Sequence, residues 1–247
     1  MLELDAWLEI AKSVALEGGN YLLQNQGKEL KVLMDSGRDI KLQLDTDTEK
    51  LIKESLSSQS SFSILGEETG QSNNLGEFYW VVDPLDGTSN FLRDIPISCV
   101  SIALMQDVTP ILGVIYDFNH DDLYFGHQNT KAFLNQNEIT VSDYSKKNQS
   151  TLVTGIPAKT HYSDEEFKNM INDFQDWKKV RMIGSAAMAA IYVAAGKAET
   201  YKENGIFLWD IAAGAAIVEA AGGVASIKNI QADYRVDAIF TNQHLAN

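Results

Sequence analysis

The chain has 247 residues, and its 34 Asp and Glu residues against 20 Lys and Arg residues give a formal net charge of −14. With 45% hydrophobic residues, it has the composition of a globular protein large enough for one large domain or two lobes. The acidic excess argues against nucleic acid polymers and anionic membranes as partners, because both attract surfaces rich in Lys and Arg.

Cysteine usage and the N-terminus bear on the cellular compartment. The one cysteine, Cys99, excludes an internal disulfide and any CxxC motif, and its apolar neighbours predict a small buried side chain. The first residues lack the basic region and apolar stretch of a signal peptide. No apolar run reaches the roughly 18 residues needed to cross a bilayer. We therefore expect a cytoplasmic protein.

The first half of the chain predicts helices followed by a sheet. Apolar residues at three- and four-residue spacings predict a helix over 2–24, and the polar stretch 27–39 predicts a loop or hairpin before a strand over 40–44. Thr46 and Glu49 have the spacing of a capping box, which predicts a helix over 47–57. Consecutive strands without helices between them predict an antiparallel sheet. The predicted strands are 62–65, 78–82, 98–106, 110–117, 122–126 and 131–141.

The pattern changes near residue 145, where strands and helices begin to alternate. This alternation is typical of an α/β lobe. We predict an N-terminal α+β lobe over 1–145 and a C-terminal α/β lobe over 146–247. The predicted strands of the second lobe are 151–154, 180–183, 198–203, 224–227 and 236–241, and its predicted helices are 163–176, 185–195 and 209–221.

Acidic residues gather at the ends of apolar strands. Glu67-Glu68 and the pair Asp83 and Asp86 each follow a strongly apolar strand, and Asp210 stands at the start of a predicted helix. A carboxylate at the end of a buried strand is costly unless a cation or hydrogen-bond donors compensate its charge. Several converging carboxylates with a carbonyl and a hydroxyl form the ligand set that Mg²⁺ prefers.

Each acidic cluster also has an ordinary structural interpretation. A Glu-Glu pair is usually solvated, an Asp-Pro pair usually marks a turn, and Asp210 could be the N-cap of the helix that follows it. The three clusters together favour a cation site over three unrelated coincidences.

Three motifs resemble the signatures of the inositol monophosphatase family. They are Gly-Glu-Glu at 66–68, Trp-Val-Val-Asp-Pro-Leu-Asp-Gly-Thr-Ser-Asn-Phe at 80–91 and Trp-Asp-Ile-Ala-Ala-Gly at 209–214. Members of this family are lithium-sensitive, Mg²⁺-dependent phosphomonoesterases. The resemblance implies a layered α/β/α/β/α sandwich of the sugar-phosphatase type, two to three Mg²⁺ ions in the site, inhibition by Li⁺ and a homodimer.

The resemblance also implies roles for individual residues. A first Mg²⁺ would be held by Glu67, Asp83 and the carbonyl of Leu85. A second would be held by Asp83, Asp86 and Asp210. Glu67 would also help to hold a third, looser ion. The catalytic residues would be Thr88, which orients the attacking water, with Asp45 and Glu67. The substrate would meet Asp86, Gly87, Thr88, Gly184, Ser185, Ala186, Glu203 and Asp210.

The acid that pairs with Thr88 remains open between Asp45 and Asp47. The spacing from Asp45 to Glu49 and Ile52 fits the family better than the spacing from Asp47 does. The family usually has Thr three residues before this Asp, whereas this chain has Leu42. We therefore predict Asp45.

The motifs leave the substrate open and exclude some other chemistries. Inositol-1-phosphate is the first candidate, and 3′-phosphoadenosine 5′-phosphate, fructose 1,6-bisphosphate and histidinol phosphate are alternatives. Asp45-Thr46-Asp47-Thr48 superficially matches phosphatases that form an aspartyl-phosphate, but the strand before it is half polar. A calcium loop starting at Asp83 fails on ligand spacing. A non-catalytic, metal-binding regulatory protein is the alternative of another class.

Overall fold

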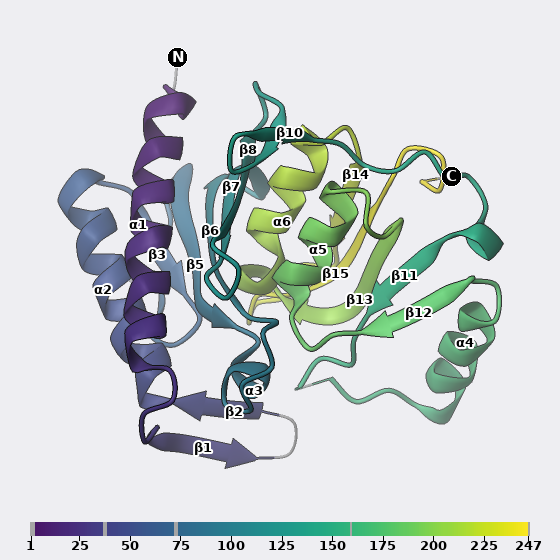
Figure 1. Ribbon diagram of the computed structural model, residues 1–247, viewed down its shortest axis with the longest axis horizontal. Helices are drawn as coiled ribbons and strands as arrows, with labels where there is room; N and C mark the ends of the chain where they lie inside the picture. Colours follow the sequence, from purple (N-terminus) through teal and green to yellow (C-terminus); the bar gives the residue numbers. More distant parts are fainter. Residues whose placement is uncertain (1–2, 37–38, 72–73, 159, 247) are drawn as a thin grey trace.

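The computed structural model describes residues 3–36, 39–71, 74–158 and 160–246, and it has five layers (Figure 1). Helices α1 (Leu4–Asn25) and α2 (Gln43–Gln59) cover one face of an eight-stranded sheet. Helices α5 (Ala186–Ala194) and α6 (Leu208–Ala220) lie between this sheet and a five-stranded sheet. Helix α4 (Asp164–Phe174) lies outside the second sheet. This arrangement confirms the predicted α/β/α/β/α sandwich.

The eight-stranded sheet has the order β10-β9-β8-β7-β6-β5-β3-β4 and is antiparallel except for the pair β3 and β5. Each strand up to β10 precedes residue 145. The bounds are β3 (Ser63–Gly66), β4 (Gly70–Gln71), β5 (Phe78–Asp86), β6 (Cys99–Gln106), β7 (Thr109–Asp117), β8 (Asp122–His127), β9 (Ala132–Leu134) and β10 (Asn137–Ile139).

The five-stranded sheet has the order β12-β11-β13-β15-β14, with β12, β11 and β13 parallel and the remaining pairs antiparallel. Its strands are β11 (Thr151–Thr154), β12 (Lys179–Met182), β13 (Thr200–Phe207), β14 (Val224–Lys228) and β15 (Arg235–Thr241). A separate hairpin joins β1 (Val32–Ser36) to β2 (Asp39–Leu42), and the short helices are α3 (Thr88–Phe91) and the 3₁₀ helix η1 (Lys147–Gln149).

Helix α6 is apolar over most of its surface, and both sheets cover it; the exceptions are Asp210 in its first turn and the exposed Glu219 near its end. A Cβ atom on Gly113 of β7 would stand 2.1 Å from the carbonyl oxygen of Ala213, so the helix backbone touches the first sheet. Phe240 of β15 and Tyr201 of β13 are fully buried on its other side. One apolar core therefore contains residues from both predicted lobes, and the lobe boundary near residue 145 stays a prediction.

The structure corrects several predicted element boundaries. Helix α2 begins at Gln43, so Thr46 lies inside the helix and the predicted capping box at Thr46 and Glu49 is wrong. The Asp45 carboxylate caps the helix instead, since its Oδ2 accepts a hydrogen bond from the Leu42 amide at 2.8 Å. The single strand predicted over 131–141 is the hairpin of β9 and β10. Residue 2 of the first predicted helix and residues 37 and 38 of the predicted hairpin lie outside the described residues.

Across the described ranges, none of the helices combines the length and the apolar character needed to cross a membrane.

Candidate active site

Three predicted metal ligands come together between the two sheets. One carboxylate oxygen from each of Glu67, Asp83 and Asp210 lies within 4.8 Å of the others. Glu67 directly follows β3, Asp83 lies in β5, and Asp210 is in the first turn of α6. The three residues are separated in sequence, so the fold itself assembles the cluster.

A bulge in β5 sets the positions of Asp83 and Asp86. Asp83 pairs with Ser101 and Asp86 pairs with Cys99, so β5 advances three residues where β6 advances two. Bulges of this kind redirect side chains at functional sites. The bulge contains Pro84, which fixes its backbone.

The carboxylates of this cluster carry negative charge that burial makes costly. Burial, reinforced by the neighbouring carboxylates, raises the pKa of Asp83 and of Asp210 well above the usual range and the pKa of Glu67 to about 8. A divalent cation removes this cost, and carboxylate oxygens are its preferred ligands. The residues present therefore fit a hard divalent ion.

Asp86 joins the first sheet to α5. Its Oδ2 accepts hydrogen bonds from Ser185 Oγ at 2.5 Å and from the Ala187 amide at 2.7 Å. The amide of Ala186 also donates to this carboxylate. Burial raises the pKa of Asp86 to about 6 although these donors oppose the shift. Asp86 thus lies beside the predicted substrate residues Ser185 and Ala186.

The predicted phosphate-binding turn follows Asp86. Gly87 has φ +90°, and a Cβ atom there would stand 2.7 Å from the carbonyl oxygen of Ile97, so only glycine fits. Thr88 begins the single-turn helix α3, and its hydroxyl donates to the carbonyl oxygen of Leu85 at 3.0 Å. The predicted metal-ligating carbonyl and the predicted catalytic hydroxyl are therefore in direct contact.

Asn90 connects this turn to the predicted substrate residue Gly184. Its Nδ2 donates to the carbonyl oxygens of Ile97 and Ile183, each at 2.8 Å. Gly184 itself has φ +75°, and a Cβ atom there would stand 3.1 Å from Asn90 Nδ2. Sequence reasoning assigned Asn90 no role, because its partner Ile183, just after β12, is not visible in the motif.

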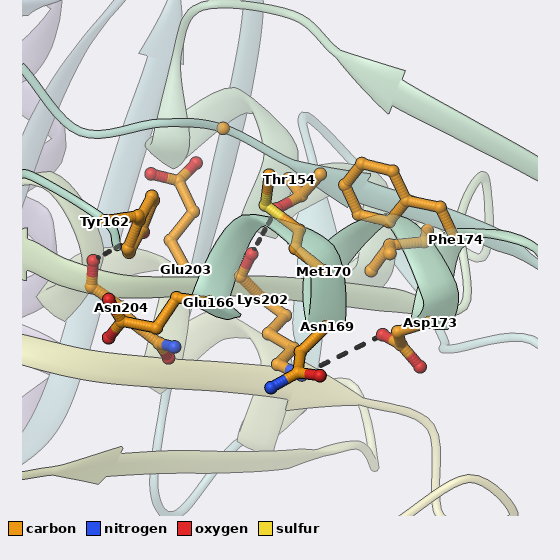
Figure 2. Close-up of a pocket in the computed structure, with 12 residues that line it drawn as sticks. Thr154, Tyr162, Glu166, Asn169, Met170, Asp173, Phe174, Lys202, Glu203 and Asn204 are labelled. Carbon is orange, nitrogen blue, oxygen red and sulfur yellow. Dashed lines mark hydrogen bonds and ion pairs between the residues drawn. The ribbon is translucent and has the colours of Figure 1, made fainter. Parts of the chain in front are cut away.

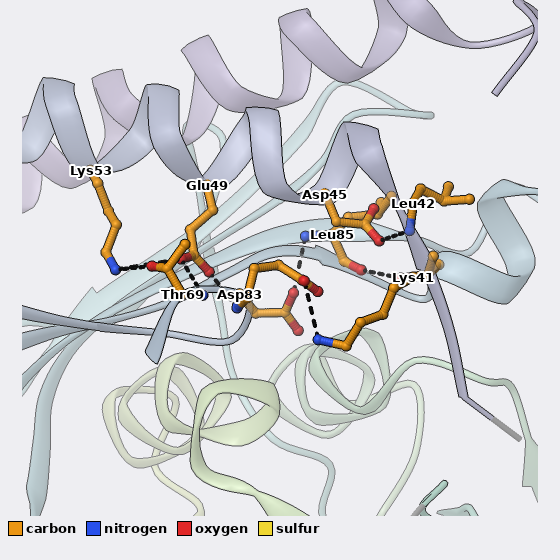
Figure 3. Close-up of polar contacts among 10 residues, drawn as sticks. Lys41, Leu42, Asp45, Glu49, Lys53, Thr69, Asp83 and Leu85 are labelled. Atoms are coloured by element: carbon orange, nitrogen blue, oxygen red, sulfur yellow. Dashed lines mark hydrogen bonds and ion pairs between the residues drawn. The ribbon is translucent and has the colours of Figure 1, made fainter. Parts of the chain in front are cut away.

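Asp45 and Asp47 have different surroundings. The Asp45 side chain is buried, and its Oδ1 has no hydrogen-bond partner among the described residues (Figure 3). Burial raises the pKa of Asp45 to about 7. Asp47 is exposed and accepts a hydrogen bond from Gln43 Nε2 at 3.0 Å. Of the two acids, Asp45 has the environment typical of a catalytic group.

Glu49 holds the loop that carries Glu67 in place, a role that sequence reasoning missed (Figure 3). Its Oε2 accepts from the Glu68 amide at 2.7 Å, and its Oε1 accepts from the Thr69 amide at 3.0 Å and from the Thr69 hydroxyl. Lys53 Nζ lies 3.4 Å from Oε1. A carboxylate on the buried face of α2 was the available sequence signal, since Thr48, Ile52 and Leu56 share that face.

The predicted substrate contact Glu203 lines a cavity of about 210 Å³ between α4 and the strands β11 and β13 (Figure 2). Burial, reinforced by the charge of Asp86, raises the pKa of Glu203 to about 8. A Cβ atom on Gly155 would stand 2.5 Å from Glu203 Oε1, so glycine leaves room for this carboxyl group. Other lining residues are Tyr162, Asn169, Met170, Phe174 and Lys202.

Comparison with known proteins gives matches over nearly the whole chain. Residues 3–239 match the inositol monophosphatase family. An inositol-1-monophosphatase of Synechocystis is 35% identical over 91% of this chain and 79% of its own length. A fructose-1,6-bisphosphatase/inositol-1-monophosphatase of Aquifex aeolicus is 33% identical over 92% of this chain and 88% of its own length.

A solved structure shares the fold. The extragenic suppressor protein SuhB from Bartonella henselae has a TM-score of 0.86 and 30% sequence identity, over 97% of this chain and 95% of that one. The family match, the relatives and the shared fold agree with the motifs and with the acidic site between the sheets. The chain belongs to the inositol monophosphatase family of phosphomonoester hydrolases.

Proposed function

We propose that the protein hydrolyses a small phosphomonoester in a Mg²⁺-dependent reaction, with inositol-1-phosphate as the first candidate substrate. The observation that carries this proposal is the convergence of Glu67, Asp83 and Asp210 within 4.8 Å. Asp83 is buried and Glu67 and Asp210 are partly buried, and a phosphate ester needs positive charge in order to enter an acidic site.

We assign the metal ligands as the family motifs place them. Glu67, Asp83 and the carbonyl of Leu85 would hold one ion, and Asp83, Asp86 and Asp210 would hold another. The chemistry that bound Mg²⁺ supplies is neutralisation of the phosphate charge and a water molecule of lowered pKa. Since Asp210 comes from α6 and Asp83 from β5, the site is complete only when α6 is packed on the eight-stranded sheet.

The chain's own residues would orient and deprotonate the attacking water. The Thr88 hydroxyl orients the water, and Asp45 accepts a proton at Oδ1, which has no hydrogen-bond partner among the residues that the structure describes. A pKa of about 7 suits this role near neutral pH. The amides of Gly87 and Thr88 bind the phosphate, with Gly87 allowing close approach of the backbone.

The organic part of the substrate would lie against α5 and β13. Ser185, Ala186 and Gly184 border it on one side and Glu203 on the other. A carboxylate accepts hydrogen bonds from the hydroxyls of a polyol such as inositol. Fructose 1,6-bisphosphate is the second candidate, because the Aquifex relative is named for both activities.

A panel assay tests the proposal. Phosphate release is measured from inositol-1-phosphate, fructose 1,6-bisphosphate, 3′-phosphoadenosine 5′-phosphate and histidinol phosphate, with and without Mg²⁺. We expect Mg²⁺-dependent turnover that is fastest on inositol-1-phosphate, inhibition by Li⁺ and loss of activity in Asp83→Asn. The exposed residue Asp176 provides the control, Asp176→Asn, which should keep full turnover. No release from any of the four esters would favour the non-catalytic alternative.

We also propose a cytoplasmic homodimer. The homodimer is the assembly that the family resemblance implies. Light scattering of the purified protein measures its mass against the 27.3 kDa of one chain. A mass of one chain at every concentration would contradict the homodimer.

A further inference from the structure

Lys41 brings an ammonium group to the edge of the acidic site. Its Nζ lies 3.1 Å from Glu68 Oε2, and the side chains are 25% and 6% exposed. Its positive charge also opposes the rise in the pKa of Asp45 and of Glu67 that burial causes. Figure 3 shows Lys41 and Asp45 at this edge of the site. One lysine therefore acts on three carboxylates of the site.

The partner of Lys41 has a fixed position. Glu49 anchors the Glu68 amide at 2.7 Å, so the loop after β3 keeps the Glu68 carboxylate next to Glu67. Lys41 reaches this carboxylate from β2, which pairs with β1 and belongs to neither large sheet. The ion pair thus joins the hairpin to the loop that carries a predicted metal ligand.

Glu67 lies between the acidic cluster and the charges near the hairpin. Its carboxylate converges with those of Asp83 and Asp210, and the charges of Glu68, Lys41 and Asp45 also act on its pKa. A divalent ion placed on the hairpin side would meet the repulsion of this ammonium at short range. An ion on the side of Asp83 and Asp210 lies farther from that charge.

We propose that Lys41 is a built-in cation that takes the place of a third, loosely held divalent ion beside Glu67 and Glu68. Lys41 is a positioning residue that limits metal loading, and the resting protein binds two divalent ions. This inference rests on the proposed metal-dependent function. It concerns only the number of ions and the residue that sets it.

The test counts bound metal without any substrate. Metal-free protein is titrated with Mn²⁺, and the free ion is measured by electron paramagnetic resonance. We expect two bound ions in the wild type and a third in Lys41→Met and Lys41→Gln. The loosest site should tighten about tenfold or more when the charge is removed. Lys41→Arg keeps the charge and should bind two ions.

Two further variants separate local charge from other effects. Lys50 lies on the exposed face of α2, with its Nζ 3.9 Å from Glu54. The variant Lys50→Met therefore removes the same charge as Lys41→Met, but away from the site. It should still bind two ions. The double variant Lys41→Met with Glu68→Gln removes both partners and should return to two ions. A third ion in this double variant would overturn the role of Glu68 in the proposal.

The possible failures are distinguishable. Two ions in Lys41→Met with unchanged or weaker affinity would overturn the role of Lys41, because a purely structural tether predicts that result. A wild type that binds no Mn²⁺ would overturn the proposed metal-dependent function as well.

Discussion

Asp45 and Asp47 lie two residues apart on α2 but in opposite environments. Asp45 is buried with a pKa raised to about 7, and Asp47 is exposed. We expect Asp45→Asn to lower kcat by roughly 10²–10⁴-fold, because an amide cannot accept the proton. Asp47→Asn is the matched control and should keep wild-type turnover. Initial rates of phosphate release measure both variants, and equal rates would contradict the assignment of Asp45.

The sequence was sufficient to identify the acids of the cluster but not the groups that hold them. Glu67, Asp83 and Asp210 stand out because a carboxylate at the edge of an apolar segment needs compensation. The role of Glu49 depends on a loop 19 residues away that returns to meet it, and local spacing suggested a helix cap instead. Asn90 escaped notice for the same reason, because its partner Ile183 is 93 residues away.

At the scale of elements, α2 and the loop after β3 form one unit. Glu49 accepts three hydrogen bonds from this loop, and its side chain is fully buried. We expect Glu49→Gln to reduce the free energy of unfolding by about 1–3 kcal/mol, because an amide nitrogen replaces one acceptor oxygen. Mn²⁺ binding should also weaken, since Glu67 lies in the same loop.

Urea unfolding and a Mn²⁺ titration measure these two effects. Glu54→Gln is the control, because Glu54 is exposed on the same helix and should change neither quantity. If Glu49→Gln kept wild-type stability and metal affinity, the loop would not depend on Glu49.

Helices and strands were predicted accurately where apolar residues recur at the regular spacing of a helix or a strand. The predictions failed where contacts between residues far apart in the sequence determine where an element begins or ends. The amphipathic α1 and most of the apolar strands were predicted to within about two residues, whereas β5 and β13 each continue four residues beyond the predicted end. The start of α2 was missed because Leu42 and Asp45 cap it without a Ser or Thr in the usual place. The order of strands in the sheets follows from packing on α5 and α6, which the periodicity of one segment does not encode.

At the scale of the whole molecule, close contact between α6 and β7 holds the two sheets together. A Cβ atom on Gly113 would stand 2.1 Å from a backbone oxygen of α6. We expect Gly113→Ala to destabilise the protein by at least about 1–3 kcal/mol, because backbone atoms cannot yield as a flexible side chain can. Gly76→Ala is the control, since a Cβ atom there would stand 3.9 Å from the carbonyl oxygen of Phe78, an ordinary contact. Equal urea midpoints in both variants would contradict this contact.

The charge of the site links metal binding to the stability of the whole molecule. Burial raises the pKa of Asp86 to about 6, of Asp45 to about 7, and of Glu67 and Glu203 to about 8, from values of 3.8 or 4.5. At pH values between the ordinary pKa of these groups and their raised pKa, the folded protein binds more protons than the unfolded chain. The stabilisation from these groups is complete below about pH 4 and is lost as the pH rises to about 8.

Mg²⁺ should reverse this trend, because bound cations replace the protons on the ligands. We expect the Tm of the protein in chelator to fall between about pH 5.5 and 8.5, and the increase in Tm on adding Mg²⁺ to grow over the same range. Asp210→Asn removes one ligand and should reduce this increase at every pH. Thermal unfolding followed by circular dichroism measures the effect, and an increase that shrinks as the pH rises would contradict the exchange of protons for metal. If the expected result is found, part of the net charge of −14 belongs to the acidic site, where bound cations neutralise it. If the opposite result is found, that net charge describes the protein surface alone.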